Sequence, residues 1–588
     1  MSDTNCMKPM NGETGQRTVI RGGTVLDGTG GEPYAADVEI VGGRIGRVGV
    51  VPGGDAVTID ATGKLVTPGF IDIHTHYDGQ VTWSTQLAPS SAHGVTTAVL
   101  GNCGVGFAPC RPADRMRLVH LMEGVEDIPE IVFTHGLPWA WESFPDYLDF
   151  LASRRYDMDI GAYVPHAAVR VYAMGERGAA RAEATAEDRA AMRKLVTEAA
   201  RAGALGFATS RSVNHRSSDG ANTPMYEAGR EEMLEIARGL GDAGTGLLQM
   251  AGLNDDEADF KLLADMVGIS GRPAIFSLAQ SHAKPRAWQG TLGKLDAARA
   301  AGVPIAAQVC GRSVGMLQGL DTSLHPFVFH PSYKAIADLP LAGRLARLRD
   351  PALRARLLAE KPEPTATADP RAFTRAVDLE GIYELGDPPN YEPCAEDSIA
   401  ARARALGVAP EALAYDLLLK DEGRNLFLRP LHNYADHDFE AVRAMLVHPG
   451  THVGLGDGGA HLGYICDAGL PTFMLTFWAR DRARGDLLPL PQVVRTLTLD
   501  LATQIGLTDR GRIAPGLRAD LNVIDYERLR LHRPHVVHDL PGGGRRLLQD
   551  ASGYDLTMVA GVVTQRAGQP TGAWPGRLVR GGQPAVAH

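Results

Sequence analysis

The sequence has few cysteines, no long apolar run and no cluster of basic residues, and each absence excludes a class of protein. Its six cysteines are scattered over 588 residues, which is not a disulfide framework, so most are expected to be free thiols. No uninterrupted apolar run approaches the roughly 18 residues that span a bilayer. The net charge of -10 is spread along the chain without a Lys/Arg block, so nucleic acid is not an expected partner.

The start of the chain and its composition indicate a globular protein without a leader. Residues Met1 to Gln16 are polar and lack the apolar core of a signal peptide, which predicts a cytoplasmic protein that does not meet a membrane. Apolar residues make up 44% and charged residues 22%, which excludes wholesale disorder. The length predicts a large domain and at least one smaller unit. The oligomeric state stays open, with a homo-oligomer among the alternatives.

Residues 66–78 predict a buried strand that ends by presenting two imidazoles. Its apolar run, up to Ile73, is typical of a strand covered on both faces. Because side chains alternate between the faces of a strand, His74 and His76 project to one side together with Asp72. Two neutral imidazoles on one rigid strand form half of a metal site. An arbitrary His-x-His pair is more often an ordinary strand end, so the surrounding residues must decide.

Short apolar strands alternate with amphipathic helices along the middle of the chain, which is the sign of parallel β/α units. One helix follows Thr185-Ala-Glu-Asp188, a string with the form of a capping box, and its apolar residues recur at the spacing of one helical face. Eight strands are expected, at residues 66–76, 95–103, 159–166, 203–209, 246–251, 274–281, 303–310 and 452–457. Together they predict an α/β fold with a TIM-type (β/α)8 barrel.

Two regions lie outside this alternation. Residues 311–451 separate the seventh from the eighth strand, far more than one crossover needs, and they predict an inserted subdomain over 315–430. Short strands with glycine turns occur near both chain ends, including a hairpin at Gly42-Gly43. Residues 1–15 are expected to form a flexible tail.

The string Pro68-Gly-Phe-Ile-Asp-Ile-His-Thr-His-Tyr-Asp78 resembles the first barrel strand of the amidohydrolase superfamily. Together with Gly101-Asn-Cys-Gly104, it is similar to the D-aminoacylase (N-acyl-D-amino-acid deacylase) branch, and the resemblance covers nearly the whole chain. The resemblance implies that residues 16–64 and 505–588 pair into one small β-sandwich beside a metallohydrolase barrel over 65–504. D-aminoacylases also carry an insertion at the place expected here.

Five residues close the expected strands at the edge where a TIM-type barrel holds its active site. They are His74, His76, Cys103, His282 and Asp457. A mixed set of nitrogen, sulfur and carboxylate ligands suits zinc. In the resembled family the cysteine is a thiolate ligand, and the strand-eight aspartate both contacts a metal and accepts the proton of the attacking water. From the residues alone, a core thiol and a turn-forming aspartate would be the more frequent interpretations.

Three other positions bear on the metal count and the substrate. The expected fifth strand offers Gln249 where the family has a metal-binding histidine, so one tight zinc site is expected and a second site lacks a strong ligand. Ser281-His-Ala-Lys284 resembles a family stretch whose lysine helps to hold the substrate carboxylate, although a solvated lysine is the alternative. The arginine that follows the family's strand-eight aspartate is not evident in residues 462–469, which leaves Arg170 as a substitute anchor. Lys284, Arg170 and Gln249 are therefore the candidate substrate-binding residues.

These features predict a zinc-dependent hydrolase that cleaves the amide C–N bond of an N-acylated amino acid or a related small molecule. Zinc held by the three histidines and Cys103 would lower the pKa of water from about 16 towards 7. Asp457 would accept the proton and pass it to the leaving amine. Two alternatives stay open: a cyclic amide or imide hydrolase of the same superfamily, and a non-catalytic amidohydrolase-fold scaffold that has lost its metal.

Overall fold

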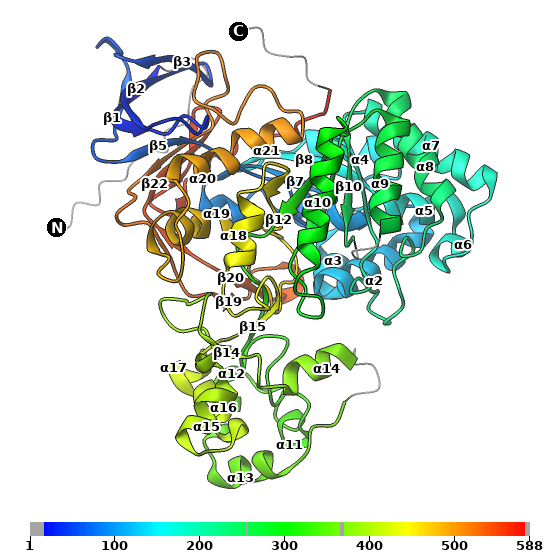
Figure 1. Ribbon diagram of the computed structural model, residues 1–588, viewed down its shortest axis with the longest axis vertical. Coiled ribbons are helices and arrows are strands. Elements are labelled where there is room, and N and C mark those ends of the chain that lie inside the picture. Colours follow the sequence, from blue (N-terminus) through cyan, green and yellow to red (C-terminus); the bar gives the residue numbers. More distant parts are fainter. Residues whose placement is uncertain (1–16, 254–256, 365–369, 583–588) are drawn as a thin grey trace, which may run out of the picture.

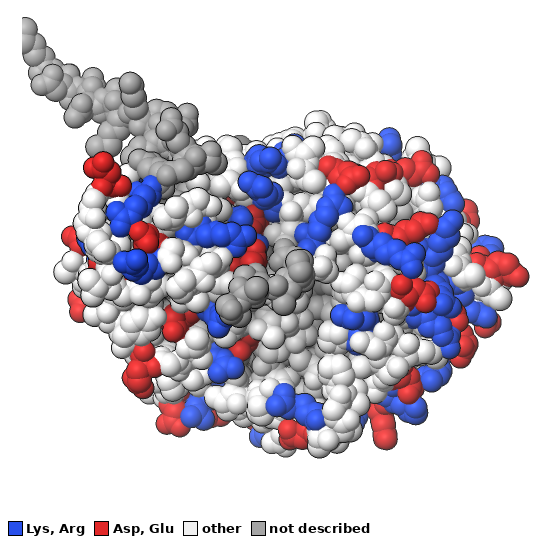
Figure 2. Space-filling view, turned by 90° about the horizontal axis from the view of Figure 1, so that it is seen from above, with Lys and Arg blue, Asp and Glu red and all other residues white. Residues whose placement is uncertain are grey.

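The computed structural model of the chain describes residues 17–253, 257–364 and 370–582. The expected flexible tail and Cys6 lie outside these ranges. The other five cysteines are all free thiols. In the described ranges, every helix is too short or too polar to cross a bilayer. On the face viewed in Figure 2, Lys and Arg side chains lie among Asp and Glu side chains.

Eight parallel strands form one sheet at the centre of the molecule, and they are neighbours in chain order. They are β6 (Phe70–Asp72), β7 (Val95–Leu100), β8 (Asp159–Pro165), β9 (Gly206–Ser210), β10 (Leu247–Ala251), β11 (Ala274–Leu278), β12 (Ile305–Val309) and β16 (Thr451–Val453). Just beyond the ends of the outer two strands, Thr75 forms a parallel bridge with Gly458. The sheet therefore curls until its first and last segments meet, which fits a TIM-type barrel.

The first expected strand, over residues 66–76, is wrong as one unit because the chain changes sheets at Gly69. Residues Leu65–Pro68 form β5, which pairs with β1 (Thr18–Val25) and β17 (Leu521–Ile524) in a second sheet. The barrel strand β6 starts only at Phe70 and pairs with β7. A Cβ atom added at Gly69 would lie 2.2 Å from Thr96 Oγ1, so glycine permits the close crossing between the two sheets.

Helices cover the outside of the barrel, as Figure 1 shows. They include α2 (Arg115–Glu126), α3 (Glu130–Gly136), α4 (Phe144–Ala152), α5 (His166–Met174), α7 (Ala186–Arg201), α8 (Arg230–Ala243), α9 (Glu257–Ser270), α10 (Ala287–Ala300), α18 (Glu440–Leu446), α20 (Leu490–Thr496) and α21 (Leu499–Gln504). The capping box expected before α7 is confirmed: the Thr185 hydroxyl accepts from the Asp188 N–H, and the Asp188 carboxylate accepts from the Thr185 N–H. The two interactions satisfy backbone donors that the first turn leaves without partners.

The second sheet combines strands from both ends of the chain, in the order β24-β23-β22-β17-β5-β1-β2-β3, with β4 against β1. Its further members are β2 (Tyr34–Val41), β3 (Arg44–Gly49), β4 (Val57–Asp60), β22 (Tyr554–Val559), β23 (Val562–Arg566) and β24 (Gln569–Pro570). The expected hairpin is confirmed, because Gly42 and Gly43 connect β2 to β3 with φ angles of 57° and 78°. A separate apolar cluster that includes Ile20, Val38 and Leu556 packs under this sheet.

Most of residues 314–432 project from one side of the barrel (Figure 1). The strands β13 (Val314–Gln318), β14 (Tyr383–Glu384) and β15 (Phe427–His432) form a small antiparallel sheet at the base of the projection. Helices follow: α11 (Pro331–Lys334), α12 (Leu341–Leu348), α13 (Pro351–Ala359), α14 (Pro370–Val377), α15 (Ile399–Leu406), α16 (Pro410–Leu418) and α17 (Lys420–Gly423). They enclose an apolar cluster of their own that includes Phe327, Leu357 and Tyr415.

The segment that follows the barrel is tied to its lower edge by a buried arginine. Arg510 is 4% exposed, and its Nη1 donates to Asp159 Oδ2 at 2.8 Å and to Thr97 Oγ1 at 2.8 Å. Arg518 also pairs with Asp159, at 2.9 Å. Asp159 begins β8, so these contacts join the chain's last third to the start of a barrel strand.

We expect Arg510→Met to lower the free energy of unfolding by about 3 kcal/mol, the lower part of the range typical when one partner of a buried ion pair is removed, because Arg518 still faces Asp159. Urea denaturation followed by circular dichroism would measure the loss. Arg528→Met, at an exposed position, is the control and should change stability by less than about 0.5 kcal/mol. Equal stability of the two variants would contradict a structural role for Arg510.

Candidate metal centre

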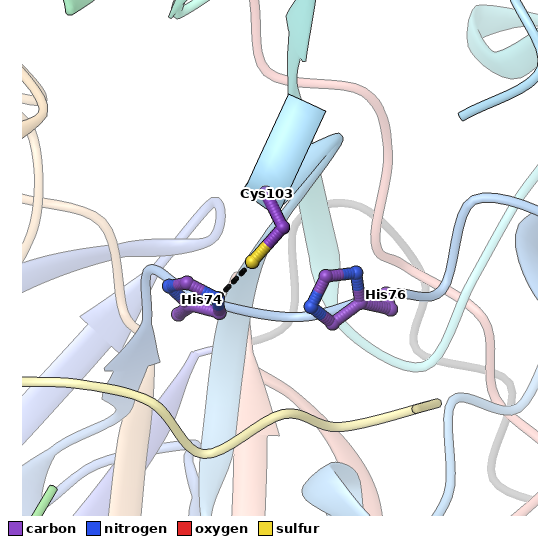
Figure 3. Close-up of side chains that lie close together, drawn as sticks. All are labelled: His74, His76 and Cys103. Carbon is purple, nitrogen blue, oxygen red and sulfur yellow. Dashed lines mark hydrogen bonds between the residues drawn. The ribbon is translucent and has the colours of Figure 1, made fainter. Parts of the chain in front are cut away.

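Three potential metal ligands converge at the upper edge of the barrel. One ligand atom from each of His74, His76 and Cys103 lies within 4.8 Å of the others, and all three residues are buried. Figure 3 shows the thiol of Cys103 pointing at His74, with His76 beside it. The Sγ atom lies 3.3 Å from His74 Nε2, and the two imidazole rings are edge-on to each other with centroids 5.5 Å apart.

The two histidines lie just beyond the end of β6 and not on the strand, which corrects the sequence prediction. Their common orientation survives because Thr75 between them still has strand-like pairing: its N–H donates to Val99 O at 3.0 Å, and it bridges to Gly458. The alternation expected of a strand therefore holds for this short extended segment.

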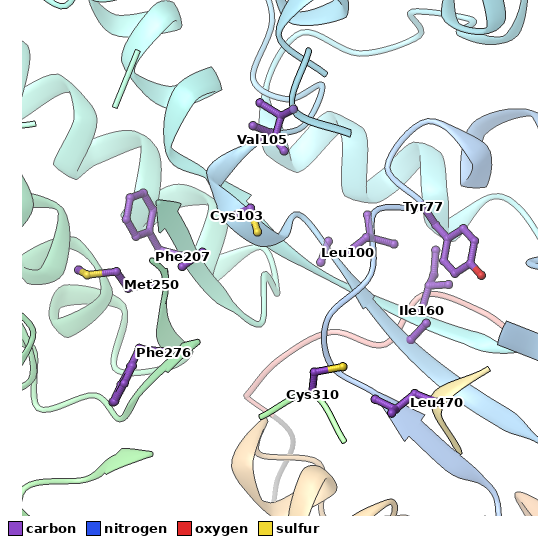
Figure 4. Packing of buried hydrophobic residues seen from close by; sticks show 14 of the residues in the cluster. Tyr77, Leu100, Cys103, Val105, Ile160, Phe207, Met250, Phe276, Cys310 and Leu470 are labelled. Atoms are coloured by element: carbon purple, nitrogen blue, oxygen red, sulfur yellow. The ribbon is translucent and has the colours of Figure 1, made fainter. Parts of the chain in front are cut away.

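Cys103 follows β7 in a single 3-10 turn over Asn102–Gly104, and its backbone has the left-handed φ of 56°. Gly101 has a φ of 84°, and a Cβ there would lie 2.3 Å from Tyr163 O. A left-handed non-glycine residue costs of the order of 1–3 kcal/mol and is typical of functional sites. Figure 4 shows Cys103 among core residues such as Leu100 and Val105, so its environment has a low dielectric constant.

Asp457 reaches the same point from the last barrel strand. Its Oδ1 lies 3.4 Å from His74 Nε2 and 3.7 Å from His76 Nε2. The Asp457 N–H donates to the carbonyl of His74 at 3.0 Å, so the junction that closes the barrel also sets this carboxylate. Asp457 has a left-handed φ of 48°, which turns its side chain toward the histidines.

The imidazoles are neutral and one is oriented by an amide. His74 Nδ1 lies 2.7 Å from Gln308 Oε1; with the amide oxygen as acceptor, Nδ1 carries the hydrogen and Nε2 offers its lone pair to a cation. Burial lowers the pKa of His74 to about 4, while the hydrogen bond to Gln308 opposes the shift. The pKa of His76 is also well below its usual value, first through burial and then through the nearby His74 and His461.

Several acidic groups are crowded into this site. Burial raises the pKa of Cys103, and the carboxylates of Glu126 and Asp457 raise it further. The pKa of Glu126 and that of Asp457 are likewise raised well above their usual values, first by burial and then by neighbouring carboxylates. A cation would relieve both the burial cost and the repulsion. Imidazole nitrogen, thiolate and carboxylate together fit a borderline-soft cation such as zinc.

The structure does not bring His282 into this cluster. β11 ends at Leu278, and the chain then turns toward the projecting segment, where the Gln280 N–H donates to Asn433 Oδ1 at 2.7 Å. Ser281 bridges to His432. As a result His282 is exposed, and it is not among the buried ligand atoms that His74, His76 and Cys103 bring together. Lys284, two residues later, is exposed on the same loop.

The other two expected substrate residues differ from each other. Arg170 on α5 is 2% exposed, and its guanidinium contacts Glu232 and the carbonyls of Gly178 and Ala182. Because these partners occupy it, we do not assign Arg170 to substrate binding. Gln249 on β10 is 1% exposed, and neither its amide oxygen nor its amide nitrogen has a hydrogen-bond partner. An unpaired buried amide is costly, so Gln249 remains a candidate for contact with a ligand.

Sequence reasoning missed two residues of the site, Gln308 and Glu126. Gln308 lies on the buried strand β12, between Ala307 and Val309. As the single polar residue of an apolar strand, it could have been recognised as a candidate site residue. Glu126 ends the buried stripe of α2, four residues after Met122. An acidic residue in an apolar stripe was the available signal there.

Comparison with known proteins shows the family. Residues 57–565 match the amidohydrolase family. An uncharacterised protein of Mycobacterium tuberculosis is 28% identical over 97% of this chain and 96% of its own length. The D-aminoacylase of Alcaligenes xylosoxydans xylosoxydans is 33% identical over 227 residues, 38% of this chain and 42% of that enzyme. The crystal structure of N-acyl-D-glutamate deacylase from Bordetella bronchiseptica, complexed with zinc and a phosphonate inhibitor, has the same fold, with a TM-score of 0.63, 23% identity and coverage of 97% of this chain and all of that one.

Cys103→Ala should lose most of any zinc that the purified protein carries, because it removes the one sulfur ligand of the cluster. Elemental analysis after dialysis against a mild chelator would measure the loss. Cys110→Ala is the matched control, because Cys110 is also a buried thiol and its Sγ donates to the Arg111 carbonyl. If both variants keep their zinc, Cys103 does not bind the metal and only packs in the hydrophobic core.

Proposed function

The chain belongs to the amidohydrolase family, and from that premise we propose that it is a metal-dependent hydrolase of the amide C–N bond in N-acylated amino acids or related small molecules. The observation that carries the proposal is the meeting of Asp457 Oδ1 with both His74 Nε2 and His76 Nε2, at 3.4 and 3.7 Å. A carboxylate in that position serves both as a metal ligand and as a proton acceptor beside it.

We assign the metal to His74, His76, Cys103 and Asp457. This set differs from the sequence prediction by the absence of His282, which lies on an exposed loop. A zinc ion held by these residues would supply a Lewis acid that lowers the pKa of water from about 16 towards 7 and polarises the substrate carbonyl. The zinc and the phosphonate inhibitor, a mimic of the reaction's tetrahedral intermediate, in the N-acyl-D-glutamate deacylase structure support this choice of metal and reaction.

The remaining steps are proton transfers by Asp457. Its carboxylate accepts a proton from the attacking water as the new C–O bond forms. As the C–N bond breaks, it returns that proton to the nitrogen, which leaves as an amine. Gln308 supports both steps indirectly, because it holds the His74 ring through Nδ1 at 2.7 Å.

The substrate side of the proposal rests on Gln249 and Lys284. The Gln249 amide is buried in the middle of β10 with both polar atoms unpaired, and it can contact a substrate amide or carboxylate. Lys284 lies on the exposed loop after β11 and is our candidate for the cation that holds a substrate carboxylate. The similarity of the chain to a D-aminoacylase and to an N-acyl-D-glutamate deacylase favours a linear N-acyl amide as substrate over a cyclic one.

Purified protein should hold close to one tight zinc per chain, because Gln249 occupies the position where a second site needs a strong ligand and an amide oxygen binds zinc weakly. Zinc content after gel filtration and activity before and after chelation would test this together. Two chelation-resistant zinc ions per chain would contradict the expected count.

Asp457→Asn should lower kcat by at least the roughly 10²-fold typical of a lost general base, because the amide keeps the size of the side chain and cannot accept the proton. The comparison variant is Asp416→Asn, whose carboxylate pairs with Arg354 at the surface and should leave kcat unchanged. Zinc content measured on the same samples separates a lost base from a lost metal. Near-normal turnover by Asp457→Asn would place the base elsewhere.

A further inference from the structure

Glu126 is a buried carboxylate at the metal centre. It is the last residue of α2 and is 1% exposed. Its Oε1 lies 3.2 Å from His76 Nδ1, and its Oε2 lies 3.6 Å from His461 Nε2. Neither oxygen has an aligned hydrogen bond. The carboxylate is therefore aimed between two imidazoles, on the side of His76 opposite to Asp457.

The backbone around Glu126 is fixed from three directions. Its carbonyl accepts from the N–H of His461, which holds the end of α2 against the loop after the last barrel strand. The next residue, Asp127, has a left-handed φ of 50°. The Asp127 carboxylate accepts from the Gly463 N–H at 3.1 Å and from the Ser323 hydroxyl at 3.2 Å. These contacts leave Glu126 little freedom to turn away from His76.

A buried carboxylate with a purely structural role looks different in this protein. Glu232 is 2% exposed, and it accepts from His166 Nε2 at 2.8 Å and from the guanidinium of Arg170. Its charge is thus neutralised inside the protein. Among the described residues, the ion pairs of Glu126 are with two histidines and include no arginine or lysine. A cation bound on the other side of His76 would supply the counter-charge that Glu232 receives from Arg170.

We propose that Glu126 is the positioning carboxylate of the metal centre: it holds His76 through Nδ1 and His461 through Nε2, and thereby keeps His76 Nε2 directed at the metal and Asp457. This inference rests on the proposed function, because it needs a cation on the other side of His76. A carboxylate that accepts from a ligating imidazole fixes the ring's tautomer and raises its basicity. Glu126 touches neither substrate nor metal in this role, so it acts through His76.

Glu126→Gln tests the proposal with metal affinity and spectroscopy. The amide has the same shape and no charge, so zinc affinity, measured by competition with a chromophoric chelator, should fall by about 10- to 100-fold, the range typical of lost partners behind metal ligands. The visible spectrum of the cobalt(II)-substituted protein should change because the field at His76 changes. Glu126→Asp keeps the charge and should recover part of the affinity.

Two matched variants separate positioning from folding. Glu232→Gln should lower the unfolding midpoint in urea and leave zinc affinity within about twofold of the wild type. Glu130→Gln, at the surface pair with His120, should change neither quantity. Zinc affinity of Glu126→Gln within twofold of the wild type, with an unchanged cobalt spectrum, would overturn the role of Glu126 while leaving the proposed hydrolase intact. A wild-type chain that binds no zinc would overturn both.

Discussion

The closure of the barrel between Thr75 and Gly458 is the constraint on which the site depends. This junction lies outside the regular strands, yet it places two candidate ligands from the start of the barrel beside one from its end. The hydrogen bonds that make it, from the Asp457 N–H to His74 O and from the His76 N–H to Gly458 O, belong to the ligand residues themselves. The site is therefore assembled by backbone pairing, and its geometry is as rigid as the barrel.

The barrel also explains why so many ionisable groups can be buried together. The C-terminal ends of parallel strands converge on a small volume, and Cys103, Asp457 and Glu126 all face it. Each would be costly there alone, and their mutual repulsion adds to the cost. One divalent cation offsets several of these terms at once. Neutral imidazoles suit such a site, because they can bind a cation without adding negative charge to the carboxylates and the thiol.

The sequence predicted the barrel and four residues that meet at the candidate site, because both have local signatures. Strand periodicity located the barrel strands, although the first expected strand included part of β5, and the motifs around His74 and Cys103 drew attention to residues that the structure brings together. The break at Gly69 was not visible, since one apolar run continues across two sheets. Glu126 and Gln308 were missed because a helix end and a strand interior carry no motif. His282 was expected at the end of a barrel strand, but it lies four residues beyond β11 on an exposed loop. The sequence pattern did not show that the chain turns away from the barrel within those four residues.

The crossing at Gly69 has a mechanical consequence. Immediately before it, β5 is held between a strand from the chain's beginning and one from its end; immediately after it, the same backbone runs through three barrel residues to the ligands. β1 and β17 thus anchor the segment that carries His74, which lies only a few residues beyond β5. Loss of β1 or β17 would free one edge of β5 and loosen the segment that presents His74, so these two strands support the candidate metal centre from outside the barrel.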